Sequence, residues 1–66
     1  MKNRLREVMR AQGLSTAELS EKSWVPTQLI NLIKLDGYEP SKGAQQRIAN
    51  ALGVHINELF YEDTNN

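Results

Sequence analysis

The sequence predicts an all-α fold of five short helices, and three features point to it. Apolar residues recur three or four positions apart, as they do on the buried face of a helix. Helix-starting and helix-ending residues divide the chain into short segments. Aromatic residues make up only 6% of the chain and its β-branched residues are scattered, so a β-sheet is not expected.

The first two helices have clear start and stop residues. Apolar spacing predicts a helix over residues 2–12, which Gly13 ends. Ser15 and Glu18 then form a capping box, in which the hydroxyl and the carboxylate accept hydrogen bonds from the free N–H groups of a helix start. The second helix therefore follows Ser15 and runs to about Ser23.

A proline separates the second helix from the third. Pro26 lacks an amide hydrogen and clashes with a preceding helical turn, so one helix cannot continue through it. We expect a new helix beside Thr27, which can act as its cap, with Ile30 and Ile33 on the buried face. The segment Asp36-Gly37 is expected to end this helix.

Two further helices complete the expected domain, which spans residues 1–61. Ser41 is the N-cap of a fourth helix that Gly53 ends, and a short fifth helix follows His55. Residues 62–66 are polar and are expected to fray.

Length and composition limit the classes of protein to which the chain can belong. The chain has 66 residues, enough for one domain, and no cysteine, so it holds no disulfide and no thiolate metal site. It contains neither an apolar run long enough to span a bilayer nor a signal-peptide pattern. We therefore expect a cytoplasmic protein with no membrane partner.

The charges cancel over the whole chain but are unevenly distributed. Eight basic residues balance eight acidic ones, which argues against a nucleic-acid partner. Residues 1–34 hold six basic and three acidic residues, a net charge of +3, whereas residues 35–66 carry −3. The basic half is the one suited to DNA, although such uneven charge is also common on small solvated helices.

Residues 15–34 have the arrangement of a DNA-binding helix-turn-helix. The small Ser20 lies inside the first helix, the apolar Val25 closes the turn, and two isoleucines anchor the second helix. The helix-turn-helix would cover residues 16–35, with its second helix in the major groove. That helix would offer four side chains to the base edges: Thr27, Gln28, Asn31 and Leu32.

These four side chains suit a DNA groove in their chemistry. Gln28 and Asn31 can each pair bidentately with adenine N6 and N7, and they lie three residues apart on one helix face. Thr27 can reach a phosphate or a thymine methyl group, whereas Leu32 can make only an apolar contact, for example with a thymine methyl group. The alternative is that all four are solvent-exposed residues of an ordinary helix hairpin.

Further segments match a known family in register. They are Arg4–Val8, Gly13–Ser15, Glu18–Lys22, Val25, Gln28, Ile30, Ile33, Gly37–Ser41, Arg47–Val54 and Ile56–Phe60. Over residues 2–61 the chain resembles the phage-repressor-type helix-turn-helix family, also called the xenobiotic-response-element family. The resemblance implies a five-helix, lambda-repressor-like fold that binds double-stranded DNA as a homodimer. It also implies a transcriptional regulator, with repression as the expected role, and no obligate cofactor.

The resemblance also implies roles for single residues. It places Gln28 at a base-reading position. Thr16 falls where the family has a glutamine that reaches a phosphate; threonine is shorter, but the helix N-terminus still favours an anion. Lys34 adds a positive charge near the DNA backbone. The phosphate contacts are expected from these residues: Arg4, Arg10, Thr16, Lys22, Lys34, Tyr38 and Lys42.

Trp24 departs from the family, which has Gly or Asn where this turn needs a left-handed backbone. Tryptophan there costs about 1 kcal/mol of strain, or else the turn has another shape. Three interpretations stay open: packing in the core, contact with DNA sugar-phosphate, and contact with a protein. At the C-terminal end, Leu59, Phe60 and Tyr61 are expected mainly in the core, with a part left uncovered as a dimer seam.

Two functions remain in competition. The first is a small homodimeric DNA-binding regulator, controlled by its abundance, by proteolysis or by a protein regulator. The second is a DNA-silent protein-interaction module on the same fold, an antirepressor or complex subunit, with Trp24, Leu32 and Leu35 as its apolar surface. An enzyme is not expected, because the single histidine, His55, suits a helix cap or the surface, and catalytic or metal sites need several convergent groups.

Overall fold

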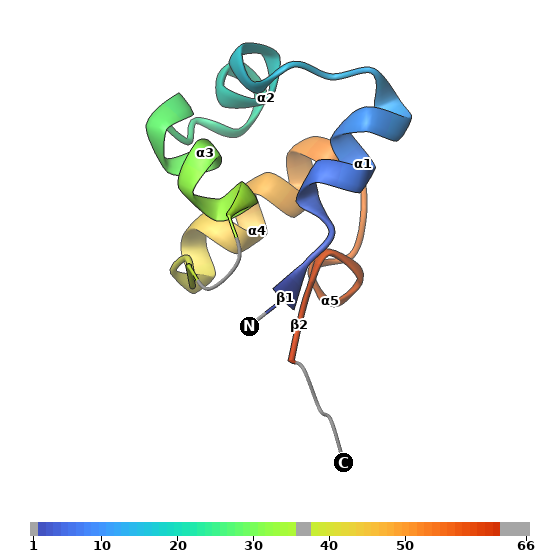
Figure 1. Ribbon diagram of the computed structural model, residues 1–66, viewed down its shortest axis with the longest axis vertical. Helices are drawn as coiled ribbons and strands as arrows, with labels where there is room; N and C mark the ends of the chain where they lie inside the picture. Colours follow the sequence, from blue (N-terminus) through green and yellow to red (C-terminus); the bar gives the residue numbers. More distant parts are fainter. Residues whose placement is uncertain (1, 36–37, 63–66) are drawn as a thin grey trace.

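A computed structural model describes residues 2–35 and 38–62, which form five helices and a short two-stranded sheet (Figure 1). The elements in chain order are β1 (Lys2–Asn3), α1 (Leu5–Gln12), α2 (Thr16–Ser23), α3 (Thr27–Lys34), α4 (Lys42–Leu52), α5 (Ile56–Leu59) and β2 (Phe60–Tyr61). The five predicted helices are confirmed. The expected helix end at Asp36-Gly37 and the fraying of residues 63–66 lie outside the described residues.

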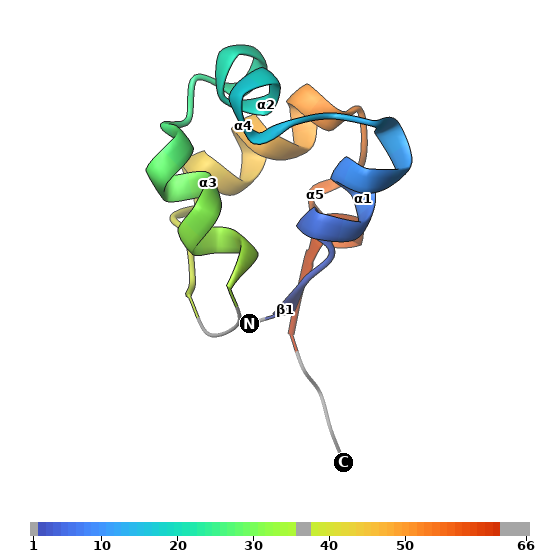
Figure 2. The same cartoon turned by 45° about the horizontal axis from the view of Figure 1, so that its top comes forward.

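The core lies between α4 and the other helices. α4 crosses the back of the bundle from beneath α3 toward α1, and α2 packs against both α3 and α4 (Figures 1 and 2). Every described helix contributes apolar side chains to this core. The buried apolar residues are Leu5, Met9, Leu19, Val25, Ile30, Ile33, Ile48, Ala49, Leu52, Leu59 and Phe60.

The sheet contradicts the expectation that the chain has none. β1 and β2 are antiparallel, with Lys2 opposite Tyr61 and Asn3 opposite Phe60. Strands of two residues are too short to show an alternation of apolar and polar positions, which is the signal that sequence offers for a strand. They form because the two distant segments supply each other's backbone hydrogen-bond partners.

Asn3 explains why the first helix starts at Leu5 and not at residue 2. Its amide nitrogen Nδ2 donates to the Ile33 carbonyl at 2.9 Å, which ties β1 to α3. Its Oδ1 accepts from the Leu5 backbone N–H at 3.0 Å, so the side chain satisfies a free donor of the first turn of α1.

The other helix ends follow the sequence predictions, with one difference. Gly13 and Gly53 end α1 and α4 with φ angles of 64° and 71°, and the Ser41 hydroxyl accepts from the Ala44 N–H at the start of α4. Thr27 does not cap α3 but is its first residue. The N-cap is Pro26, which offers no side-chain hydrogen bond.

Two serine hydroxyls hold the turn between α2 and α3. Ser20 Oγ donates to the Val25 carbonyl at 2.6 Å. The buried Ser23 Oγ donates to the Leu19 carbonyl at 2.7 Å and accepts from the Val25 N–H at 3.3 Å. Trp24 lies between these anchors with φ 62°, and it is the one non-glycine residue with positive φ in the described part of the chain. The left-handed turn that the family resemblance implied is therefore present.

Replacing Trp24 by glycine should stabilise the protein. The Trp24 side chain is 83% exposed, so its removal loses little burial, while the left-handed strain disappears. After the larger chain entropy of unfolded glycine is subtracted, we expect a gain of about 0.5–1 kcal/mol in the free energy of unfolding by denaturant titration. Trp24→Ala keeps the strained backbone and should leave stability unchanged; equal stability of the two variants would contradict this account.

The predicted capping box is confirmed at the start of α2. Ser15 Oγ accepts from the Glu18 N–H at 3.1 Å, and Glu18 Oε1 accepts from the Ser15 N–H at 2.9 Å. The hydrogen bonds from the backbone and the hydroxyl of Ser15 favour the carboxylate, and they lower the pKa of Glu18 below its ordinary value.

This capping box should make stability depend on pH. Because the folded-state pKa of Glu18 is lowered, its contribution is present above the unfolded pKa of about 4 and is lost as pH falls through the folded value. Glu18→Gln keeps an acceptor but does not titrate, so the difference in Tm between wild type and variant should shrink from pH 7 to pH about 2. Glu21→Gln, on the same helix but outside the box, is the control, and it should not show this loss.

Candidate functional site

The outward face of α3 carries the four side chains predicted to read bases. Thr27, Gln28, Asn31 and Leu32 are all exposed. On the opposite side of the helix, Ile30 and Ile33 are fully buried in the core and hold α3 in place. The amphipathic pattern of α3 therefore presents three polar side chains and one leucine to whatever binds there.

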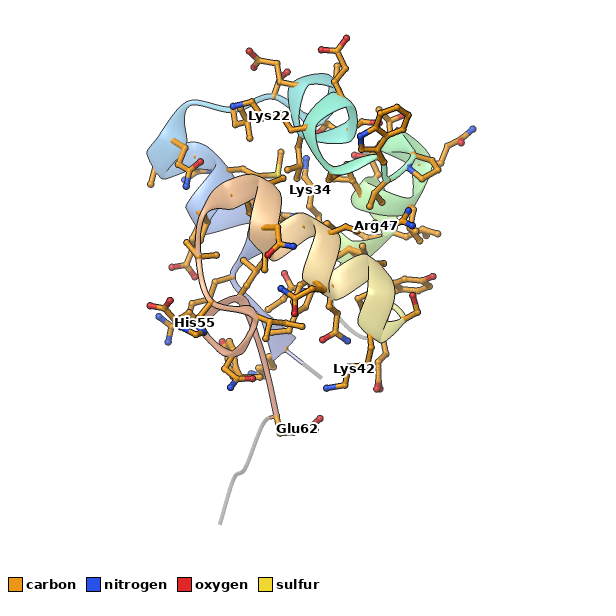
Figure 3. All side chains as sticks on the ribbon, turned by 180° about the vertical axis from the view of Figure 1, so that it is seen from behind. Lys22, Lys34, Lys42, Arg47, His55 and Glu62 are labelled. Carbon is orange, nitrogen blue, oxygen red and sulfur yellow. The ribbon has the colours of Figure 1, made fainter. Side chains whose placement is uncertain are left out.

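A lysine joins the end of α3 to the start of α2. Lys34 Nζ donates to Thr16 Oγ1 at 3.0 Å, and Figure 3 shows this side chain reaching toward α2. Both residues are partly buried. The bond brings together two residues that were predicted separately as phosphate contacts.

Next to this bond is a surface hollow of about 310 Å³, here called the cationic hollow. Its lining residues are Arg6, Met9, Arg10, Leu14, Ser15, Thr16 and Lys34. Three of the lining residues are cations and none is acidic. The N-terminus of α2 also opens into the hollow, and the helix dipole and free N–H groups there favour an anion. The hollow is chemically suited to a phosphate group.

Arg6 is a lining residue that the predicted phosphate set did not include. It lies one helical turn before Arg10 on α1, and that spacing of four in the sequence is a signal that could have found it. Arg4 lies nearby, lining a smaller hollow of about 180 Å³ with Arg6 and Lys34. Its guanidinium carbon is 5.3 Å from the ring centroid of Tyr61, a cation–π contact that fixes it over β2.

The remaining predicted phosphate contacts do not join the cationic hollow. Tyr38 is exposed on the connection from α3 to α4, and Lys42 is exposed as the first residue of α4. The buried Gln45 anchors this connection by donating to the Pro40 carbonyl at 2.9 Å. Lys22 lies near the opposite end of α2 from Thr16, about 9 Å away along the helix axis, because the two residues are six positions apart. Figure 3 shows Lys22 and Arg47 on the side of α2 and α4 seen from behind.

Comparison with known proteins agrees with this geometry. The helix-turn-helix family profile matches residues 5–59, which include all five helices. The chain belongs to the helix-turn-helix family, in its xenobiotic-response-element type. Two archaeal relatives are named uncharacterized HTH-type transcriptional regulators. The protein of Methanothermobacter thermautotrophicus is 38% identical over 96% of this chain and 93% of its own length. That of Methanocaldococcus jannaschii is 36% identical over 96% of this chain and 97% of its own length.

In this helix-turn-helix protein the predicted protein-interface residues differ in their exposure. Leu59 and Phe60 are 0% and 4% exposed, which confirms the prediction that this cluster lies mainly in the core, and neither residue is left uncovered for a dimer seam. Leu59 is the last residue of α5, and Phe60 is the first residue of β2, where it is paired with Asn3 of β1. Tyr61 is partly buried under Arg4. Trp24 is exposed, which contradicts the interpretation that it packs in the core.

Other kinds of site gain no support from the described residues. Within residues 2–35 and 38–62, no three histidine, cysteine, aspartate or glutamate side chains are grouped to hold a metal ion. His55 is exposed at the N-cap of α5, where its backbone N–H donates to Glu58 Oε1 at 3.0 Å. In the same part of the chain no helix has the length and apolar character needed to cross a membrane.

Proposed function

We propose that this protein is a cytoplasmic transcriptional repressor that binds double-stranded DNA as a homodimer, with α3 in the major groove. One observation carries the proposal. The bond from Lys34 to Thr16 joins the C-terminal end of α3, the helix whose outward face carries the base-reading residues, to the cationic hollow, so base-edge and phosphate contacts can be made together. The helix-turn-helix family and the names of the two archaeal relatives support the same function.

The residues divide between the two kinds of contact. Thr27, Gln28, Asn31 and Leu32 would read base edges. Arg6, Arg10, Thr16 and Lys34 would hold one phosphate at the start of α2, with Tyr38 and Lys42 on the adjacent backbone. Lys22 is not assigned, because it lies at the other end of α2.

A homodimer follows from the shortage of charge. The formal net charge is zero, because eight basic residues are balanced by eight acidic ones, so one copy offers no net positive charge to the phosphate backbone. Two copies related by a two-fold axis would present α3 to successive major grooves and double the number of phosphate contacts.

Binding to DNA should be specific and should depend on salt. A selection from random duplexes at about 50–100 mM salt is expected to yield a preferred sequence. With about four to six phosphate contacts per dimer, the logarithm of affinity should fall against the logarithm of salt with a slope of about −4 to −5. A selection that yields no preferred sequence would overturn the proposed function.

Two substitutions on α3 test the assignment of base-reading residues. Gln28→Ala and Asn31→Ala should each cost about 1–3 kcal/mol of binding free energy and relax one base position. Asn57→Ala, at an exposed position of α5, is the matched control and should bind as wild type does. Wild-type affinity of both α3 variants would refute the residue assignment even if specific binding is observed.

A second candidate function is docking of a protein partner at Trp24, and one observation favours it. Trp24 is exposed on a strained backbone, and strain of this kind persists at functional positions. It lines two hollows, of about 490 and 320 Å³, and Arg47 lines both of them. A large exposed aromatic side chain beside an arginine is a common feature of protein-binding surfaces.

Tryptophan fluorescence distinguishes the two contacts open to Trp24, since it is the only tryptophan. The tryptophan emission of the free protein should be red-shifted, and quenchers in solution should reach the Trp24 side chain. Addition of the selected duplex should leave it unchanged, because the two hollows that Trp24 lines include Arg47 of α4 and share no lining residue with the cationic hollow. Protection from quenching by the duplex would instead assign Trp24 to DNA and remove the basis for a protein-docking surface.

A further inference from the structure

The outward face of α3 lacks charge before its last residue. The helix sequence is TQLINLIK, and the exposed side chains of its first six positions are two amides, one hydroxyl and one apolar group. Guanine is most often recognised by an arginine or lysine that donates to its O6 and N7 atoms. Within α3 only Lys34 could do so.

Lys34 is held in a position away from the base edges. Its ammonium group donates to Thr16 Oγ1 at 3.0 Å and lines the cationic hollow, so it is positioned for a phosphate at the start of α2. The nearby arginines, Arg6 and Arg10, belong to α1 and line the same hollow. The described face of α3 therefore has no cation directed to base edges.

Leu32 adds an apolar group to the same face. Its side chain is 45% exposed although it is a leucine, and it follows Gln28 by one helical turn and Asn31 by one residue. The C5-methyl group of thymine is the apolar group that base pairs present in the major groove. Adenine, which an amide side chain recognises, is paired with thymine, so both contacts select the same base pair.

From these observations, and resting on the DNA-binding function proposed above, we propose that α3 selects a half-site composed mainly of A·T pairs. Gln28 and Asn31 read adenines, and Leu32 covers the methyl group of a thymine. Leu32 is then a specificity-determining residue, and its apolar side chain serves the DNA contact.

Replacing thymine by uracil tests the proposal, because it removes a single methyl group from the DNA. In the duplex obtained by selection, each thymidine is replaced in turn by deoxyuridine, which removes only the methyl group and keeps base pairing. Wild-type affinity should fall about fourfold at one position in each half-site, as expected for one buried methyl group. Leu32→Ala should bind the thymidine duplex more weakly and should not discriminate between thymidine and deoxyuridine at that position.

Leu35→Ala is the matched control. Leu35 is a second exposed leucine, but it follows the last helical residue and has an extended backbone, so it is not on the helical face that reads bases. This variant should keep the wild-type discrimination between thymidine and deoxyuridine. Circular dichroism melting of both variants confirms folding, which removal of an exposed leucine side chain should not disturb.

The outcomes separate this proposal from the function on which it rests. A specific half-site rich in G·C pairs, or affinity unaffected by every deoxyuridine, would overturn the proposal and leave DNA binding in place. Loss of discrimination in Leu35→Ala but not in Leu32→Ala would also overturn it. Absence of any selected sequence would instead overturn the DNA-binding function itself.

Discussion

The hydrogen bonds of Val25 to two serine hydroxyls are the constraint on which the rest of the structure depends. Val25 is buried, and its carbonyl and N–H are satisfied by Ser20 and Ser23. A buried backbone group without such a partner costs about 1–3 kcal/mol, so these bonds fix where α3 leaves the turn. That direction brings Lys34 to Thr16 and so creates the cationic hollow. The left-handed backbone of Trp24 is the strain that this turn imposes.

Features set by neighbouring residues could be predicted from the sequence. The capping box of Ser15 and Glu18 and the break at Pro26 act within a few residues, and the structure contains both. The outward face of α3 was predictable for the same reason, because helical spacing alone places Gln28 and Asn31 opposite the buried isoleucines.

Features that depend on distant segments could not be predicted. The apolar composition of the C-terminal end was visible, but Phe60, which is buried, is paired with Asn3 of β1, near the other end of the sequence. Likewise, the basic residues were recognised as a set, but only the packing of α1 and α2 against α3 separates those of the cationic hollow from Lys22. The sequence identifies the basic residues, but only the tertiary structure shows which of them line the same hollow.

The pairing of Lys2 with Tyr61 has a consequence for how the protein is made. The ribosome synthesises β1 long before β2, so the first residues must wait for nearly the whole described chain before they find their partners. During that time Leu5 and Met9 lack the cover that the C-terminal segment provides. Folding is therefore completed only after β2 has been synthesised, and the domain forms as one cooperative unit rather than helix by helix.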